Sequence, residues 1–191
     1  MRRAEARSST RPGVPGTSLR RLRVVAGRYK GRTLHAPRGA AVRPTSDKVR
    51  GAIFNVLGDV EGLNVLDLFA GTGALGIEAV SRGAAGATFI DTEPAAVRRN
   101  LGAIGLDAAV HRRDALHWLR TAKGRYDLVF ADPPYSSAPL LGARLAELLP
   151  GVLSKNARIV TESDKRAPLD LGFPLEFERD YGDTRIRIHR G

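Results

Sequence analysis

The sequence predicts an α/β fold built around a mostly parallel sheet, and three observations support this. Between Asn64 and Thr161, short apolar strand patterns alternate with helical patterns, as expected for consecutive βαβ units. A glycine-rich turn, Gly71 to Gly76, follows the first of these strands and opens a helix. Two strand patterns near the C-terminal end follow one another with no helix between them, so the sheet should finish with an antiparallel pair.

Length and composition bound the class of protein. A chain of 191 residues with 42% hydrophobic residues suits one well-buried α/β domain with a small appendage. No apolar stretch approaches the ~20 residues of a membrane helix, and the N-terminus lacks the apolar core of a signal peptide. The absence of cysteine excludes disulfides, thiolate metal sites and a cysteine nucleophile. We therefore expect a cytoplasmic protein with no membrane partner, and a monomer.

The positive charge is confined to the first quarter of the chain. The net charge is +11, but residues 1–50 contain 14 Lys and Arg against two acids, whereas residues 51–191 contain 17 against 18. A solvated tail accounts for residues 1–18, which are rich in Ser, Thr, Pro and Gly and show no periodicity. We expect this first segment to be a disordered basic tail.

Residues 19–40 form the next unit, which we expect to be a small β-hairpin. The stretches Leu22–Ala26 and Arg32–Ala36 have strand character and flank a glycine-bounded turn, Gly27–Gly31. An isolated hairpin is marginally stable in water, so it should pack on the main domain. The turn carries two cations and an aromatic residue, a combination typical of phosphate contacts plus base stacking. The hairpin is therefore predicted to bind nucleic acid, with a merely solvated basic hairpin as the alternative.

A strand, a glycine turn, a helix and a second strand then occur in that order. The glycines Gly71, Gly73 and Gly76 match the G-x-G-x-x-G spacing of nucleotide-binding turns. Asp91 follows Gly71 by 20 residues, at the end of the strand pattern Ala87–Asp91. A carboxylate at this point can accept hydrogen bonds from ribose hydroxyls. The whole series predicts a site for a nucleoside cofactor.

The remaining elements continue the alternation to the C-terminus. The pattern predicts helices at 94–104, 115–120 and 140–149, strands at 108–111, 126–131 and 157–161, and a closing pair at 175–179 and 185–189. The first of these helices begins with a proline, which suits the first helical position. Asp114 precedes the helix at 115–120, where it can either cap the helix or reach the amino group of an adenine.

Two classes of cofactor fit the glycine turn, a nicotinamide dinucleotide and S-adenosylmethionine. A pyrophosphate needs the positive N-terminus of the helix for its own charge. Asp67 lies near the end of the strand, four residues before Gly71, where it would repel a pyrophosphate and help to position the ammonium of a methionine moiety. If Asp67 were only a loop cap, the motif Asp132-Pro-Pro-Tyr135 would lack a co-substrate. The sequence therefore favours S-adenosylmethionine.

The tetrapeptide Asp132-Pro-Pro-Tyr135 directly follows the apolar strand at 126–131. Asp132 can accept a hydrogen from an exocyclic amino group, and the two prolines restrict the loop so that it presents carbonyl acceptors. Tyr135 offers a ring on which a base can stack. A plain turn is the alternative, but open α/β sheets bind ligands beyond the carboxyl ends of their strands. With a methyl donor on the same sheet, the motif indicates methylation of a nucleobase amino group.

Four segments, taken together, resemble a known family. They are Arg23-Val-Val-Ala-Gly-Arg-Tyr-Lys-Gly-Arg32, Arg43-Pro-Thr-Ser-Asp-Lys-Val-Arg50 with Phe54-Asn55, Asp67-Leu-Phe-Ala-Gly-Thr-Gly73, and Asp132-Pro-Pro-Tyr135. The last two are typical of class I S-adenosylmethionine-dependent methyltransferases. The first two are similar to the RsmD family of small-subunit (16S) ribosomal RNA guanine-N2 methyltransferases. The resemblance covers about residues 20–190.

The resemblance implies a fold, a reaction and a partner. The fold would be a Rossmann-like class I methyltransferase sandwich, a mostly parallel seven-stranded sheet with an antiparallel closing hairpin, plus a small N-terminal β-hairpin extension. Residues 19–40 would bind RNA and residues 41–191 would form the catalytic domain. The reaction would be methylation of the N2 amino group of one guanine in small-subunit ribosomal RNA, within an assembled 30S particle. No metal site is implied.

The resemblance also implies roles for individual residues. The residues that would hold S-adenosylmethionine are Thr45, Asp47, Asp67, Phe69, Gly71, Gly73, Asp91, Thr92, Asp114, Ala115 and Asp132. The catalytic residues that would hold the target base are Asp132, Pro133 and Tyr135. The residues that would bind RNA are Arg23, Arg28, Tyr29, Lys30, Arg32, Arg43, Lys48 and Arg50.

Three other functions stay open on the sequence. The same tetrapeptide serves any planar amino group, so a DNA adenine-N6 or cytosine-N4 methyltransferase is the nearest alternative. The three glycines formally allow an NAD-binding oxidoreductase. An RNA-binding assembly factor with an inactive site is disfavoured because both motifs are intact.

Overall fold

The computed structural model describes residues 22–36, 45–134 and 138–191, so the predicted tail, Arg43 and Tyr135 lie outside the described residues. A seven-stranded sheet has the strand order β5-β4-β3-β6-β7-β9-β8. Its strands are β3 (Asn64–Asp67), β4 (Gly86–Asp91), β5 (Ala109–Arg112), β6 (Tyr126–Ala131), β7 (Leu153–Asp164), β8 (Leu175–Tyr181) and β9 (Thr184–Arg190). The first five pair in parallel, and β9 pairs antiparallel with both β7 and β8. The predicted fold class is confirmed.

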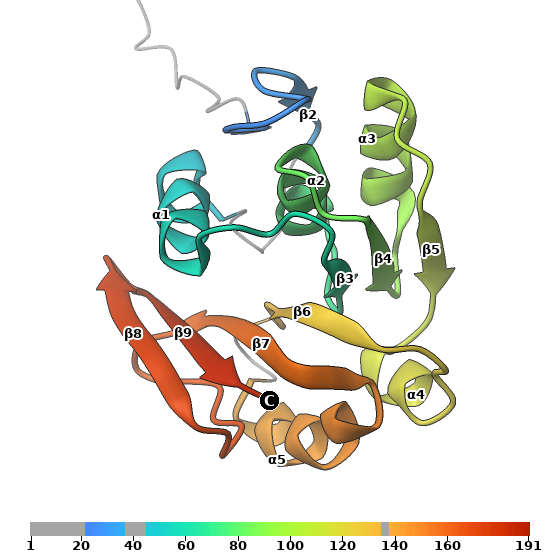
Figure 1. Ribbon diagram of the computed structural model, residues 1–191. Helices are drawn as coiled ribbons and strands as arrows, with labels where there is room; N and C mark the ends of the chain where they lie inside the picture. The colour runs from blue at the N-terminus through green and yellow to red at the C-terminus, as the bar shows by residue number, and fades with distance from the viewer. Residues whose placement is uncertain (1–21, 37–44, 135–137) are drawn as a thin grey trace, which may run out of the picture.

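Helices cover both faces of the sheet (Figure 1). On one face lie α1 (Asp47–Leu57), α2 (Ala74–Ser81) and α3 (Ala95–Ile104), and on the other lie α4 (Ala115–Leu119) and α5 (Ala138–Leu148), which a 3₁₀ turn at Leu149–Gly151 follows. Each face has its own apolar core, one containing Phe54, Ile77 and Phe89 and the other Leu66 and Trp118. The central strands are buried on both sides, which explains their continuous apolar runs. None of the helices among the described residues is long and apolar enough to cross a membrane.

The N-terminal hairpin is shorter than predicted and packs on α2 (Figure 1). Its strands are β1 (Leu22–Arg23) and β2 (Thr33–Leu34), paired antiparallel. Leu22, Val24, Tyr29 and Leu34 are buried in the same apolar core as α1, α2 and α3. The hairpin thus shares its hydrophobic core with the sheet, and burial of these side chains compensates for its few strand pairs.

The largest difference from the predicted elements is β7, which begins four residues earlier and ends three residues later than the pattern at 157–161. Its start is irregular, because Tyr126 pairs with Leu153 whereas Leu128 pairs with Arg158, and Asn156 has a positive φ of 62°. A bulge of this kind interrupts the alternation of inward and outward side chains. The first residues of the strand therefore carry no strand signal in the sequence.

The carboxyl ends of β3, β4, β6 and β7 meet at one edge of the sheet because these strands are parallel neighbours. This edge carries Asp67 at the end of β3, Asp91 at the end of β4 and Asp132 directly after β6. Three predicted site residues from separate parts of the chain are brought together here.

Candidate functional site

A cavity of about 510 Å³ opens at the carboxyl edge of the sheet. Most of its wall comes from the loops that follow β3, β4, β5 and β6. The lining residues are Thr45, Asp67, Leu68, Phe69, Ala70, Gly71, Thr72, Ala74, Leu75, Asp91, Thr92, Glu93, Ala96, Arg113, Asp114, Ala115, Asp132, Pro134 and Leu141. A volume of this size suits a nucleoside cofactor together with part of a second substrate.

Asp67 lines the cavity and is 3% exposed. Its Oδ2 accepts a hydrogen bond from the backbone N–H of Gly76 in α2, at 3.2 Å. Burial raises the pKa of Asp67 to about 7; the bond from Gly76 lowers it, and the nearby charge of Asp91 raises it further. No arginine or lysine in the described part of the chain forms an ion pair with this carboxyl group. A cationic ligand group would relieve the cost of ionising it.

Glycine stands at each of the three positions of the turn for a different structural reason. Gly71 lines the cavity with a φ of 52°. Gly73 is buried behind it, at the start of α2 with a φ of 76°, and a Cβ there would lie 2.6 Å from Val97 of α3. At Gly76 a Cβ would lie 2.4 Å from the ring of Phe89 in β4, so only glycine lets α2 approach the sheet. Gly73 therefore shapes the turn without lining the cavity.

Asp91 is fixed by backbone donors from two sides. Its Oδ2 accepts from the N–H of Gly71 at 2.6 Å, and its Oδ1 accepts from the N–H of Glu93 at 2.7 Å. The carboxylate is half-buried and lines the cavity. A rigid carboxylate at the end of the second strand is well placed to accept hydrogen bonds from vicinal hydroxyls.

Asp114 takes both roles that its position allows. It is the N-cap of α4, because its Oδ1 accepts from the N–H of His117 at 2.9 Å, and it also lines the cavity. Ala115, the next residue, lines the same wall, as do Thr92 and Phe69. The structure therefore brings six predicted cofactor residues around one cavity besides Asp67, Asp132 and Thr45.

Asp132 follows β6 and lines the cavity together with Pro134. It is half-buried, and Pro133 between them is buried. Burial, then the charge of Glu162, then the charge of Asp67 raise the pKa of Asp132 well above its usual range. Pro133 has no N–H to donate, so the loop offers an ionisable acceptor and backbone carbonyls at this point.

Thr45 lines the cavity beside this acceptor, but Asp47 does not. The Thr45 hydroxyl donates to Glu162 Oε2 at 2.5 Å. Asp47 instead accepts from the side chain of Arg50 at 2.8 Å and from the N–H of Arg23 at 3.3 Å. The structure therefore does not bring Asp47 to the cavity, since its carboxylate forms part of the contact between α1 and the hairpin.

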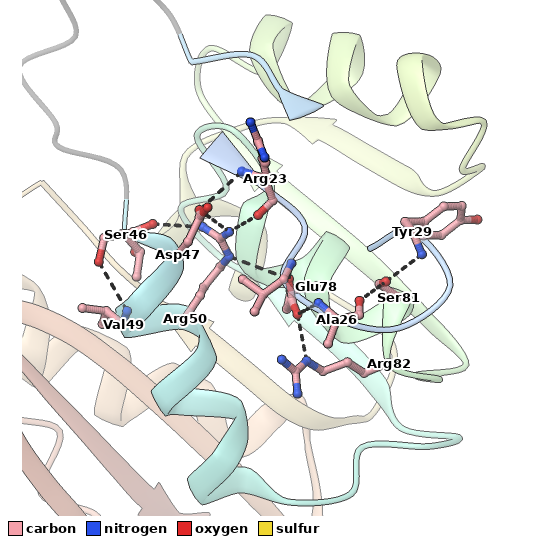
Figure 2. A network of polar contacts seen from close by, with 12 residues as sticks. Arg23, Ala26, Tyr29, Ser46, Asp47, Val49, Arg50, Glu78, Ser81 and Arg82 are labelled. Carbon is pink, nitrogen blue, oxygen red and sulfur yellow. Dashed lines mark hydrogen bonds and ion pairs between the residues drawn. The ribbon is translucent and has the colours of Figure 1, made fainter. Parts of the chain in front are cut away.

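Arg50 is a structural cation, and the prediction that it binds RNA is wrong. Its side chain is 0% exposed and lies between α1, α2 and the hairpin (Figure 2). It donates to the carbonyl of Thr45 at 2.9 Å, to the carbonyl of Arg23 and to Asp47, and its Nε lies 3.9 Å from Glu78 Oε2. A guanidinium enclosed in this way is not available to a phosphate. The sequence could not show this, because two of the enclosing groups, Arg23 and Glu78, come from distant segments.

The carboxylate of Glu78, on α2, holds the hairpin by accepting hydrogen bonds from the hairpin backbone (Figure 2). It is 0% exposed and accepts from the N–H groups of Val25 at 2.7 Å and Ala26 at 3.0 Å. Arg82 Nε donates to the same carboxylate at 2.8 Å. These contacts fix the hairpin rigidly against α2.

The hairpin turn is held by a second set of contacts, with Ser81. Ser81 Oγ accepts from the N–H of Tyr29 at 2.9 Å and donates to the carbonyl of Ala26 at 2.5 Å. A Cβ on Gly27 would lie 1.7 Å from the Ser81 carbonyl oxygen, so glycine is required there. Tyr29 is 9% exposed, packs in the core and hydrogen-bonds Arg28 through its hydroxyl. The prediction that its ring stacks on RNA is wrong for the same reason, since its face is covered by protein.

The other predicted RNA residues within the described part of the chain are exposed. They are Arg23, Arg28, Lys30 and Arg32 on the hairpin and Lys48 on α1. Arg43 and Tyr135 lie outside the described residues. These exposed cations make the hairpin surface positively charged, although Arg50 and Tyr29 are buried.

Sequence reasoning missed several residues at the cavity. Glu162, 4% exposed in β7, lies behind Thr45 and next to Asp132. Arg113 and Glu93 line the wall beside Asp114 and Asp91. Glu93 and Arg113 each follow the end of a strand by one or two residues, a position that could have indicated them. Glu162 lies inside a strand and gives no such signal.

Comparison with known proteins shows what the chain is similar to. A family model described as Conserved hypothetical protein 95 matches residues 22–190. The chain is 40% identical over 181 residues to YlbH of Bacillus subtilis, provisionally named as an rRNA methyltransferase, covering 88% of this chain and 98% of that protein. It is 39% identical over 179 residues to ribosomal RNA small subunit methyltransferase D of Escherichia coli, covering 88% and 89%. The solved structure of yhhF from Escherichia coli, also provisionally named as a methyltransferase, has a TM-score of 0.75 at 33% identity, covering 89% and 97%.

Proposed function

The chain belongs to the RsmD family, matched by the Conserved hypothetical protein 95 model, and from this we propose that it methylates small-subunit ribosomal RNA with S-adenosylmethionine as the methyl donor. The observation that carries the proposal is the cavity at the carboxyl edge of the sheet. Asp67, Asp91 and Asp114, carboxylates suited to a cationic nucleoside, line it, and the Asp132 acceptor lines it as well. The proposal makes the protein an RNA methyltransferase.

The donor set fits S-adenosylmethionine better than a dinucleotide. Asp67, which forms no ion pair with the described arginines and lysines, would hold the ammonium of the methionine part, and Asp91 would hold the ribose hydroxyls. Asp114 and Ala115 would hold the adenine. A pyrophosphate would place negative charge beside the carboxylates of Asp67, Asp91 and Asp114. When bound, the cofactor supplies an electrophilic methyl group on a sulfonium.

The acceptor end of the cavity fits an exocyclic amine. Such a nitrogen is a poor nucleophile because its lone pair is delocalised into the ring. Asp132 and the carbonyl of Pro133 would accept its hydrogens and hold it in line with the methyl group, so positioning and electrostatics supply the rate. We propose guanine N2 as the target, with Tyr135 stacking on the base. A paired guanine must swing out of its helix to reach this pocket.

The RNA surface is proposed to be the hairpin with the start of α1. Its exposed cations, Arg23, Arg28, Lys30, Arg32 and Lys48, can contact the phosphates that flank the target. Two of them, Lys30 and Lys48, are suitable probes because charge reversal there leaves the Glu78 and Ser81 contacts intact. The partner is proposed to be the assembled small subunit, and a ribosomal substrate implies a cytoplasmic location.

The activity is tested first by mapping methylated nucleotides in ribosomal RNA from cells that lack the gene. One guanine in small-subunit RNA should lose its N2 methyl group, and a plasmid copy should restore it. An Asp132→Ala copy should not restore it, although the purified variant should bind S-adenosylhomocysteine with nearly unchanged affinity. Loss of an adenine or cytosine methyl group in DNA would instead support the alternative methyltransferase. Wild-type restoration by Asp132→Ala would contradict the role of the acceptor.

The RNA surface is tested with the double variant Lys30→Glu and Lys48→Glu. We expect weaker binding of small-subunit particles. The slope of the logarithm of the affinity against the logarithm of the salt concentration should be smaller by about one unit for each lost phosphate contact. Cofactor affinity should not change. Lys123→Glu, an exposed cation in the segment after α4, is the matched control. Equal effects of the probe and the control would contradict the assignment of the surface.

A further inference from the structure

Glu162 occupies the position beside Asp132 at the carboxyl edge of the sheet. In the parallel pair of β6 and β7, Ala131 is aligned with Thr161, so the next residues of the two strands, Asp132 and Glu162, lie side by side. Neighbouring strands are about 4.8 Å apart, and aligned residues of a parallel pair point to the same face. Asp67, from the other neighbour of β6, lies on this face as well, since it is aligned with Phe130. Two further carboxyl groups therefore flank the acceptor.

The groups around Glu162 hold it in place without neutralising it. The Thr45 hydroxyl donates to Oε2 at 2.5 Å. Arg50 is the cation that faces it from α1, but the hydrogen bonds of this guanidinium go to Thr45 O, Arg23 O and Asp47. Burial raises the pKa of Glu162 to about 6, the Thr45 bond lowers it, and the charge of Arg50 lowers it further. From β6 the neighbour is the acid Asp132, which in turn has Asp67 of β3 on its other side.

The reaction needs a proton acceptor at this point. In the transfer, a bond forms between the amine nitrogen and the methyl carbon while the carbon–sulfur bond breaks and leaves its electron pair on sulfur. The nitrogen then carries a positive charge and loses one proton. An ordinary carboxylate is a weak base at neutral pH, and general-base catalysis is most effective when the pKa of the base lies near the working pH.

We propose that Glu162 is a positioning residue for the methyl transfer: its carboxylate, fixed by Thr45, faces Asp132 and makes Asp132 the stronger acceptor for the proton that the amine loses. The inference rests on the proposed function, since it assigns a role at the same site. Two like charges at neighbouring positions disfavour joint ionisation, so a proton taken up by Asp132 relieves their repulsion. The pair titrates as a unit, and its two steps belong to both groups.

The test is Glu162→Gln, which keeps the volume and the oxygen that accepts from Thr45 but removes the charge. The first measurement needs no activity: a carbon-13 NMR titration of the aspartate carboxyl groups, with the Asp132 signal assigned by its loss in Asp132→Asn. We expect the Asp132 midpoint to move to lower pH in Glu162→Gln and its titration to simplify to one step. An unchanged midpoint would overturn the proposal, whether or not the protein proves to methylate ribosomal RNA.

The second measurement is the pH profile of methyl transfer to small-subunit particles prepared from cells that lack the gene. The acid limb should move to lower pH in Glu162→Gln, because Asp132 now ionises more readily, and the plateau rate should fall about tenfold with the weaker base. S-adenosylhomocysteine affinity should stay the same. Ser163→Ala is the control; this neighbour is buried on the opposite face of β7 and its hydroxyl has no hydrogen-bond partner among the described residues. A lower rate with an unmoved acid limb would show that Glu162 is merely structural.

A third variant separates the charge of Glu162 from its support. Thr45→Val removes the bond that holds Glu162 and keeps its ionisable carboxyl group. The acid limb should then stay on the high-pH side, as in the wild type, whereas the rate falls with the looser geometry. A shift to lower pH equal to that of Glu162→Gln would overturn the proposal. Failure of the wild type to methylate any small-subunit RNA would refute the proposed function and leave the NMR result to decide the role of Glu162.

Discussion

Two regions of the molecule bury carboxyl groups in opposite ways. Glu78, on α2, is enclosed by two backbone N–H groups and two arginines, Arg50 and Arg82. Asp67, at the carboxyl edge of the sheet, is about as buried but has one backbone donor and other acids for neighbours. The pKa values of Asp132 and Glu162 are raised by burial as well, although the Thr45 hydroxyl and the charge of Arg50 compensate Glu162 in part. The carboxylate of Glu78 is therefore neutralised by its surroundings, whereas the carboxyl group of Asp67 is not.

The difference separates structure from function on physical grounds. A buried charge is tolerated when hydrogen bonds and a counter-charge replace water, and the Glu78 region meets this condition without a ligand. The edge of the sheet meets it less well, so the pKa values of Asp67, Asp132 and Glu162 are raised, and a ligand that brings donors and positive charge would favour their ionised forms. Perturbed acids that line a cavity are characteristic of functional sites. Both regions lie against α2, and Gly76 connects them by donating its N–H to Asp67.

The largest effect is expected from Glu78→Ala, which would break the neutralised region. This substitution leaves Arg50 with a weaker counter-charge and leaves two N–H groups of the hairpin without the acceptor that they have in the wild type. We expect the free energy of unfolding to fall by about 3–5 kcal/mol, measured by urea denaturation. Glu147→Ala is the matched control, a glutamate paired with Arg144 on an exposed helix face, and should cost less than about 0.5 kcal/mol. Similar losses in the two variants would show that the Glu78 contacts contribute little.

The next effect is expected from Asp67→Asn, which would remove an uncompensated charge. S-adenosylmethionine affinity should fall at least about tenfold, or 1.4 kcal/mol, because the ligand ammonium loses its counter-charge. The same variant should be more stable than the wild type without cofactor at pH 8, by on the order of 2 kcal/mol. Calorimetric titration and urea denaturation measure the two effects. A variant that loses both cofactor affinity and stability would contradict the view that the Asp67 charge is uncompensated in the folded protein.

The pH dependence of this gain follows from the sign of the pKa shift. The pKa of Asp67 is about 7 in the folded protein against an ordinary value of 3.8, so the folded state holds a proton that the unfolded state releases. The free energy of unfolding therefore falls as the pH rises from about 4 to 7, and the loss is complete above that range. Asp67→Asn should flatten this slope and match the wild type near pH 4. Asp132 and Glu162 shift in the same direction, so a residual slope should remain.

The sequence predicted the edge of the sheet better than the hairpin face, and the reason is physical. Asp67, Asp91 and Asp132 each end an apolar strand, and parallel strands bring such ends together whatever the details of packing. Arg50 and Tyr29 look like solvent-facing residues of a basic segment. Their burial depends on Glu78 and Ser81, which the chain supplies much later, so no local pattern could reveal it.

Glu162 was missed for a related reason. It continues a strand that sequence patterns placed at 157–161, so it carries none of the loop signals that mark the other acids. Its significance depends on the register of β7 against β6, which a bulge at the start of β7 helps to set. Register is a property of the folded sheet and not of either strand alone.

The smallest effect is expected from Arg82→Met, which tests whether the neutralisation of Glu78 is redundant. Arg82 donates to Glu78 at 2.8 Å and its guanidinium lies 4.8 Å from the centre of the Phe54 ring, but its side chain is 20% exposed. Methionine keeps the contact with the ring, and Glu78 keeps Arg50 and two N–H donors. We expect a loss of about 1 kcal/mol on urea denaturation, and a coupling of similar size in a double-mutant cycle with Glu78→Gln. A loss as large as that of Glu78→Ala would mean that Arg82 alone neutralises the buried carboxylate, because Arg50, whose Nε is 3.9 Å away without a hydrogen bond, would then contribute nothing measurable.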